Sequence, residues 1–342
     1  MLSKGQNRRG HGRVTLSDVA RVANVSTITV SRTIRSPDLV SADTRERVEE
    51  AIRQLGYIPN LLAGGLASNE SRVVAAIVPT LANSIFAEKL QGIFDVLSEN
   101  NYQLVLGSSN YDPLQEESLI RVFLSHRVAG IIITGASHSP GANELLEKSR
   151  IPVVETWSLL GNPTVGSVGF SNYAAAFGVV RHLYERGYRH LGFVSAPTEN
   201  NDRAQERRRG FVAALKEFGL ERRDDVILTN TFSLQAGTES LRRILEKRPD
   251  TDAIFCANDT LAAGALLESQ RLGLAVPGRV AIAGFDDLET SSHVIPALTT
   301  VRIRRREIGH RAAEMLLASL SGESLIEKKI DLGFEIVVRA ST

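Results

Sequence analysis

The apolar residues of the first sixty positions recur at helical spacing in three short segments, 16–24, 27–34 and 42–55. Within each segment they fall on one face, as expected of helices that pack around a small shared core. The three apolar faces consist of Leu16, Val19, Ala20 and Ala23, of Val30 and Ile34, and of Val48, Ile52 and Leu55.

Helix-capping residues bound these segments. Thr15 and Asp18 match a capping box, in which each side chain satisfies a backbone N–H of the first turn. Ser26 and Ser41 are candidate N-caps of the second and third helices, and Gly56 is expected to end the third. Two short helices joined by a tight turn form a helix-turn-helix, whose second helix lies in the major groove of DNA.

The second helix carries polar side chains where a DNA-recognition helix needs them. Its first residues are expected at base edges, the hydroxyl groups that follow can reach phosphate or base, and Arg32 can make a bidentate contact with guanine. A small helical bundle with an ordinary polar surface is the alternative interpretation. The predicted DNA contacts in this part of the chain are Thr15, Ser26, Thr27, Ile28, Thr29, Ser31 and Arg32.

From residue 72 the pattern changes to strands that alternate with helices, which predicts parallel sheets covered on both faces. The alternation runs through two successive series, so we expect two lobes with a ligand-binding cleft beyond the carboxyl ends of the strands. The predicted strands are 73–78, 102–107, 130–134, 152–155, 191–195, 226–229, 253–256 and 280–285. The predicted helices are 86–100, 115–125, 144–149, 174–186, 207–217, 236–247 and 260–272, and residues 297–301 are expected to cross between the lobes.

The fold class is therefore α/β, with a helix-turn-helix headpiece and a two-lobed, doubly wound core. The predicted domains are a basic tail (1–13), the headpiece (14–58), a hinge (59–71) and a core for effector binding and dimerisation (72–342). The net charge is only +1, but the tail carries four Lys or Arg residues and no acid, as suits a module that binds a polyanion. A solvated tail is the alternative.

Other features narrow the function class. The single cysteine, Cys256, excludes a disulfide framework and fits a reducing compartment. Because the sequence shows neither a signal peptide nor an apolar run long enough for a bilayer, we expect a cytoplasmic protein without a membrane partner. It also lacks a nucleotide-binding fingerprint, metal-ligand spacing and a nucleophile elbow, so we expect neither an enzyme nor a bound cofactor or metal.

Residues 14–32, 40–48 and 55–60 resemble the headpiece of the lactose/galactose repressor family. The resemblance implies a homodimer on a pseudo-palindromic operator, and a hinge helix that folds only on DNA and wedges a leucine into the minor groove. Its implied DNA contacts are Asn60, Ala63 and Leu66. Gly64 and Gly65 each weaken a helix by about 1 kcal/mol, so we expect this hinge to be unfolded without DNA.

The core resembles the same family, whose fold is shared with periplasmic solute-binding proteins. By this resemblance Asn258 and Asp286 bind ligand hydroxyl groups, Arg207 grips the effector and Phe232 stacks on its apolar face. The loop after the first strand supplies Thr80, Asn83 and Phe86. The alternatives are that Asn258 only caps a helix, that Asp286 only forms a turn, and that Arg207 is part of a solvated surface run.

Two differences from the usual family sequence favour an anionic effector. Trp157 stands where the family commonly has an aspartate, and it either packs within its lobe or faces the cleft. Arg305 lies where the family places a pocket residue, and an arginine fork is the natural partner of a carboxylate. The core is most similar to the gluconate-repressor branch, which implies a sugar acid such as gluconate or a keto-gluconate. The resembling stretches are 86–88, 187–190, 255–259, 268–273, 276–277, 281–285 and 331–334.

The expected mechanism is that effector binding closes the cleft and rotates the N-lobes of a dimer, so that the hinges cannot fold together on the operator. The effector is expected to act as an inducer, but the sequence also allows a corepressor. A neutral sugar or a phosphosugar remains an alternative effector. A solute-binding protein is the alternative from another class, and the headpiece opposes it.

Overall fold

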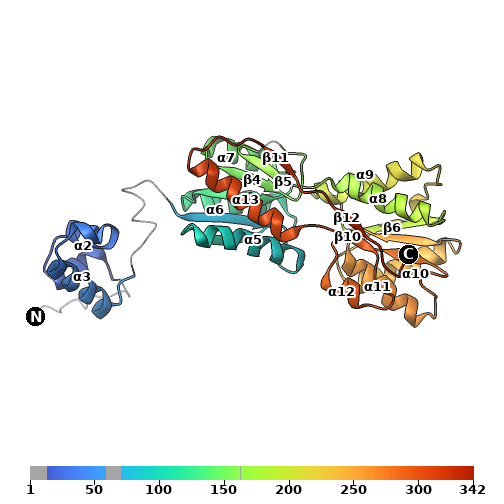
Figure 1. Cartoon of the computed structure of the whole chain (residues 1–342), viewed down its shortest axis with the longest axis horizontal. Coiled ribbons are helices and arrows are strands. Elements are labelled where there is room, and N and C mark those ends of the chain that lie inside the picture. The colour runs from blue at the N-terminus through green and yellow to red at the C-terminus, as the bar shows by residue number, and fades with distance from the viewer. Residues whose placement is uncertain (1–13, 59–70, 162) are drawn as a thin grey trace, which may run out of the picture. The chain divides into compact units, whose positions relative to one another are not determined.

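The computed structural model describes residues 14–58, 71–161 and 163–342 (Figure 1). The chain divides into two compact units, Met1–Ser71 and Arg72–Thr342. The predicted basic tail and the predicted hinge contacts Asn60, Ala63 and Leu66 lie outside the described residues.

The first unit contains α1 (Leu16–Ala23), α2 (Thr27–Arg35), a short 3-10 helix η1 (Pro37–Leu39) and α3 (Ala42–Leu55). Both bonds of the expected capping box are present at the start of α1, and the Ser26 hydroxyl accepts from the Thr29 N–H at 3.1 Å. Gly56 ends α3 in the left-handed conformation with φ 60°. The predicted cap at Ser41 is wrong in detail, because its hydroxyl donates to the Thr44 side chain instead of accepting from the helix backbone.

A single apolar cluster holds these helices together. Val19 of α1, Val30 of α2 and Val48 of α3 are fully buried at its centre. All nine apolar positions predicted from helical spacing belong to this cluster or pack against it. The helical period alone therefore identifies the core of the headpiece.

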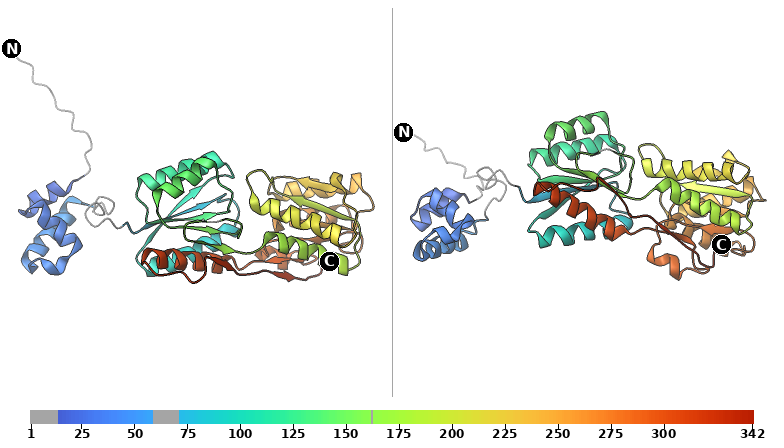
Figure 2. Two further views of the ribbon diagram at one scale, coloured as in Figure 1. Left: turned by 90° about the horizontal axis from the view of Figure 1, so that it is seen from above. Right: turned by 45° about the horizontal axis from the view of Figure 1, so that its top comes forward.

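The N-lobe of the second unit is built on a six-stranded parallel sheet with strand order β11-β5-β4-β3-β1-β2. Its strands are β1 (Val73–Val78), β2 (Gln103–Ser108), β3 (Gly130–Thr134), β4 (Val153–Thr156), β5 (Gly166–Gly169) and β11 (Lys329–Asp331). The helices α5 (Ile85–Glu99) and α13 (Arg305–Leu320) cover one face, and α6 (Pro113–Ser125) and α7 (Pro140–Ser149) cover the other (Figure 2).

Side-chain alternation in β1 explains why both faces are covered. Val74, Ala76 and Val78 pack into the apolar cluster that includes α5 and α13, whereas Ala75 and Ile77 pack into the cluster of α6 and α7. A strand whose residues are apolar at every position must be buried on both sides.

The C-lobe repeats this plan around a four-stranded parallel sheet with order β7-β6-β8-β9. The strands are β6 (Leu191–Ser195), β7 (Ile227–Thr229), β8 (Ala253–Cys256) and β9 (Ala281–Ala283). One pair of helices is α8 (Asn172–Glu185) with α9 (Asp202–Glu217), and the other is α10 (Leu234–Lys247) with α11 (Asp259–Arg271). Two short helices, η2 (Asp224–Val226) and α12 (Glu289–His293), complete the lobe.

The chain passes between the lobes three times: from β5 to α8, from β10 (Thr300–Arg302) to α13, and from β11 to β12 (Glu335–Val337). β10 and β12 pair antiparallel. The predicted crossing at 297–301 is therefore a few residues too early, because the Leu298 and Thr299 N–H groups still bond Ser291 and Ser341. The second passage brings the chain back to the N-lobe, where it forms α13 and β11, and the third leaves the N-lobe again; neither α13 nor β11 was predicted from the sequence.

Glycines allow α13 to pack tightly against α5. A Cβ at Gly92 would collide with the Arg306 carbonyl, and one at Gly309 would collide with the Lys89 carbonyl. The two helices therefore touch backbone to backbone beside the cleft. Among the described residues, no helix combines the length and hydropathy that a membrane span requires.

Candidate functional site

A cavity lies where the two lobes meet, with about 400 Å³ of empty space that is partly open to solvent. Trp157, Ser195 and Asn258 enter it just beyond or at the carboxyl ends of β4, β6 and β8, which is where parallel α/β sheets bind ligands. Its walls are Ile85, Phe86, Tyr111 and Trp157 from the N-lobe, and Ser195, Ala196, Asn201, Arg203, Ala204, Arg207, Phe232, Ala257, Asn258 and Asp286 from the C-lobe.

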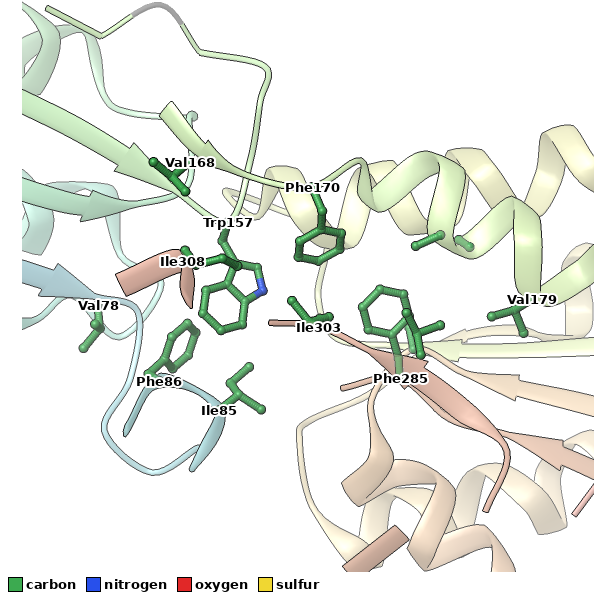
Figure 3. Close-up of a cluster of buried hydrophobic side chains, with 14 of the residues drawn as sticks. Val78, Ile85, Phe86, Trp157, Val168, Phe170, Val179, Phe285, Ile303 and Ile308 are labelled. Carbon is green, nitrogen blue, oxygen red and sulfur yellow. The ribbon is translucent and has the colours of Figure 1, made fainter. Parts of the chain in front are cut away.

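Trp157 forms the apolar wall on the N-lobe side. Its side chain is completely buried in the N-lobe core, and its ring lies 5.4 Å from that of Phe86 (Figure 3). Its backbone adopts φ 73°, an unusual conformation for a bulky residue. The indole therefore packs within its lobe and also lines the cavity, and its contact with an effector stays a prediction.

Arg207 of α9 is buried and fixed from several sides. Its Nε donates to the side-chain oxygen of Asn172 at 2.9 Å, and its Nη1 donates to the Ala257 carbonyl at 2.7 Å. The guanidinium lies 3.7 Å from the centre of the Phe285 ring. Burial lowers the pKa of Arg207 to about 10, so it stays charged at neutral pH. It does not belong to a solvated surface run.

Asp286 and Asn258 form the polar corner of the cavity. The amide of Asn258 donates to Asp286 Oδ2 at 2.7 Å, while its oxygen caps α11 by accepting from the Thr260 N–H at 2.8 Å. Asp286 Oδ1 lies 4.0 Å from Arg207 Nη2 and has no hydrogen-bond partner among the described residues. Burial raises the pKa of Asp286 to about 7, although the charge of Arg207 opposes this. A free acceptor inside a cavity suits a ligand hydroxyl.

The remaining predicted effector residues fall into two groups. Phe86 and Phe232 line the cavity, and the Phe232 ring lies 6.2 Å from that of Tyr111 in the opposite lobe. Thr80 and Asn83 do not line it, because their side chains accept from the Ala82 and Ile85 N–H groups and shape the loop before α5.

Arg305 also lies outside the cavity wall. At the start of α13 it donates to the backbone carbonyl of Asp286 in the C-lobe, and its Nη2 donates to Glu88 of α5 at 2.6 Å. It therefore connects the lobes just behind the cavity, and in this structure its charge is taken up by Glu88.

Sequence reasoning missed Arg203, Tyr111 and Asn172. Arg203 stands one helical turn before Arg207, so their spacing of four residues places both on one face of α9. That spacing was a usable signal. Tyr111 adopts φ 61° in the loop after β2, and Asn172 is the first residue of α8. Nothing in the sequence marks those two, because the tertiary fold alone brings Tyr111 to the cavity and Asn172 behind it, against Arg207.

The candidate DNA-recognition surface lies on α2. Thr27, Ile28 and Arg32 are exposed, while Val30 faces the core. Ile28 is 69% exposed, which is unusual for an isoleucine on a helix that has an apolar core available. The hydroxyls of Ser26 and Thr29 contact each other at 2.9 Å, and that of Thr15 takes part in the capping box. Ser31 is partly exposed on the same helix.

A helix-turn-helix unit joined to a two-lobed core with a polar cavity defines a DNA-binding regulator that responds to a small ligand. Comparison with known proteins agrees. Residues 15–60 match the family described as bacterial regulatory proteins, lacI family, and residues 180–342 match the periplasmic binding protein-like domain.

Relatives and solved structures match over nearly the whole chain. The HTH-type transcriptional regulator GntR of Pseudomonas aeruginosa is 38% identical over 338 residues, 98% of each chain. A LacI-family regulator from Silicibacter pomeroyi has a TM-score of 0.88 and 37% identity, covering 96% of this chain and 99% of its own. The lac repressor dimer bound to operator and the anti-inducer ONPF has a TM-score of 0.79 and 26% identity, covering 96% and 99%.

The chain belongs to the lacI family of bacterial regulatory proteins, and it is a transcriptional repressor of that family. The predicted family and fold class are thereby confirmed. Members of this family bind operator DNA and small-molecule effectors, and the relatives compared are transcriptional regulators rather than enzymes.

Proposed function

We propose that this protein represses transcription as a homodimer on a pseudo-palindromic operator in the cytoplasm, and that a sugar acid such as gluconate releases it. The observation that carries the effector class is the charge of the cavity. Arg203 and Arg207 line it, and the acids near them are Asp286, whose pKa is raised to about 7, and Asp202, which pairs with Arg203 outside the cavity wall. A cavity with excess positive charge favours an anionic ligand.

The other cavity walls suit the rest of such a ligand. Asn258 and the free oxygen of Asp286 can bind hydroxyl groups, while Trp157 and Phe86 present apolar surface to C–H groups. Because a tryptophan replaces the acid expected at position 157, no carboxylate at that position repels an anion. These features together support a polyhydroxylated acid over a neutral sugar.

Support for the DNA side comes from α2 and from the family. The exposed residues of α2, Thr27, Ile28 and Arg32, have side chains that can contact bases and phosphates. The lac repressor compared above is a dimer bound to its operator. We extend that arrangement to this chain, with the two α2 helices in successive major grooves.

Coupling between the two sites follows from the position of the cavity. A ligand that contacts both Trp157 of the N-lobe and Arg207 of the C-lobe stabilises the closed arrangement of the lobes over any open one. Closure then changes the spacing of the paired headpieces. A coupling free energy of about 1–3 kcal/mol lowers operator affinity roughly 5–150-fold.

A thermal-shift screen of the full chain tests the effector class. The panel contains D-gluconate, a keto-gluconate, D-glucose, D-glucitol and D-glucose 6-phosphate. We expect the sugar acids to raise the melting temperature of the core, because a ligand at about 100 times its Kd adds roughly 2.7 kcal/mol of stability. Shifts with glucose and glucitol but none with the acids would refute the sugar-acid assignment.

A further inference from the structure

We propose that Arg203 binds the anionic group of the effector, and that Lys89 supplies a second positive charge near it. This inference deepens the proposed function by assigning the carboxylate of the sugar acid to one place in the cleft. It replaces Arg305 as the carboxylate partner, because Arg305 does not line the cavity and its Nη2 donates to Glu88.

Arg203 stands where the cavity meets a second, more polar cavity of about 310 Å³. Tyr111 and Arg203 line both cavities. Ser109, Thr134 and Ser137 line the second cavity from the N-lobe, and Asn200 lines it from the C-lobe. A ligand lying along the first cavity would therefore end at Arg203, surrounded by hydroxyl and amide groups.

The guanidinium of Arg203 is buried yet only partly used. Its side chain is 9% exposed, and its Nη1 donates to Asp202 at 2.7 Å. Within the described residues, its Nε and Nη2 have no hydrogen-bond partner, so one complete edge of the fork is free. Arg207, by contrast, commits both Nε and Nη1 to protein oxygens. A carboxylate accepts from two parallel N–H groups of such an edge.

Lys89 adds charge behind the wall of the second cavity. Its side chain is completely buried, and its Nζ donates to the hydroxyl groups of Thr134 and Thr156. Thr134 is itself part of the second cavity wall. Burial, together with the nearby charge of Arg203, lowers the pKa of Lys89 to about 7. The two cations repel each other, and a carboxylate that binds at Arg203 would relieve that repulsion.

Asp202 pairs with Arg203 and offsets part of its charge, whereas the acids that line the second cavity are engaged with other groups. Glu116 contacts His138 Nδ1 at 2.7 Å. Burial lowers the pKa of His138, but the contact with Glu116 and the nearby Glu155 together raise it to about 9. Asp112 is committed to capping α6 by accepting from the Leu114 N–H at 2.8 Å. Nε and Nη2 of Arg203 therefore remain available to a ligand that occupies this region.

Calorimetric titration of the full chain with D-gluconate and D-glucitol tests the assignment. The two ligands carry the same hydroxyl chain and differ in whether C1 is a carboxylate or an alcohol. Arg203→Gln should weaken gluconate binding roughly 10- to 100-fold and leave glucitol binding unchanged, because one charge-assisted pair is lost. Arg209→Gln, an exposed arginine on the same helix paired with Glu206, is the matched control and should bind like the wild type.

Two further variants separate the effect of positive charge from that of the arginine fork, and the effect of Lys89 from that of Arg203. Arg203→Lys keeps the charge without the fork and should retain an intermediate affinity for gluconate. Lys89→Met should weaken gluconate binding less than Arg203→Gln does. Circular dichroism and the melting temperature confirm that each variant is folded.

The outcomes separate this inference from the proposed function. If the wild type prefers gluconate and Arg203→Gln retains the same preference, Arg203 is not the anion site, although the sugar-acid effector stands. If D-glucose 6-phosphate binds instead and depends on Arg203, the anion site stands and the sugar-acid assignment falls. If neither anion binds more tightly than glucitol, both fall.

Discussion

The side-chain oxygen of Asn172 accepts a hydrogen bond of 2.9 Å from Nε of Arg207. The amide nitrogen of the same residue donates to the carbonyl oxygen of Trp157 at 3.0 Å. Asn172 is buried at the first passage between the lobes, so it ties the tryptophan wall of one lobe to the arginine of the other. Both of its polar atoms are used, which leaves it a positioning residue behind the cavity.

Asn172→Ala should therefore weaken effector binding by about tenfold while leaving operator binding unchanged. The variant removes one buried hydrogen bond to a charged group, worth roughly 1.5–3 kcal/mol, and part of that loss falls on the orientation of Arg207. Calorimetry with D-gluconate measures the change. Asn143→Ala, an exposed asparagine on α7, serves as the control. Wild-type affinity in Asn172→Ala would mean that Arg207 is held by its other partners alone.

The raised pKa of Asp286 makes the stability of the core depend on pH. The folded protein keeps this proton up to about pH 7, whereas the unfolded chain releases it near 3.8. Between these values the folded state binds more protons, so the contribution of Asp286 to the free energy of unfolding falls as pH rises. Asp286→Asn should gain stability relative to the wild type across this window, by at most about 1.4 kcal/mol per pH unit.

Urea unfolding of wild type and Asp286→Asn at pH 5, 6, 7 and 8 measures this difference. Comparing the two proteins cancels the titration of groups that both share. A difference that stays constant with pH would show that Asp286 is ionised in the folded protein, held so by Arg207.

Arg32→Ala should weaken operator binding by about 1–3 kcal/mol without unfolding the headpiece. The Arg32 side chain is exposed on α2, and a bidentate arginine–guanine contact is worth this much. Arg53→Ala on α3 is the control, since Arg53 is exposed but pairs with Glu50. Binding to DNA enriched from a random pool by the wild type gives the comparison. Equal losses in both variants would indicate general electrostatic attraction.

Gly309→Ala should destabilise the core by roughly 1–3 kcal/mol, because its methyl group would meet the Lys89 carbonyl at the contact of α13 with α5. Gly178→Ala on α8 is the matched control. There the nearest atom is the tip of the Ile336 side chain, and the helix gains propensity from alanine. If thermal unfolding shows the two variants to be equally stable, the close approach of the helices has been overstated.

Local pattern predicted most elements well and their boundaries less well. The strand at 130–134 and the helix at 42–55 have the predicted bounds. α9 begins at Asp202 rather than 207, since Asn201 caps it by accepting from the Ala204 N–H. α13 was missed because it opens with charged residues directly after the short strand β10, and its buried face includes the small residues Gly309, Ala312 and Ala313. β11 and β12 are too short to show a period.

The residues around the cavity also include some that the sequence predicts and some that it does not. Three residues that the sequence marks by a strand end or by a family motif all line the cavity: Asn258, Asp286 and Arg207. Arg203 and Arg305 illustrate what sequence leaves open, since both are arginines at the first turn of a helix. Arg203 lines the cavity, whereas Arg305 contacts Glu88 because α13 packs against α5.

The central claim is that a ligand bound in the cavity changes the affinity of the protein for DNA. The most direct measurement is the affinity of the full chain for DNA that it enriches from a random pool, with and without saturating D-gluconate, at one fixed salt concentration. This account predicts tight binding without the acid and a loss of roughly 5–150-fold with it. Equal affinity in both conditions, in a protein that calorimetry shows to bind gluconate, would contradict it.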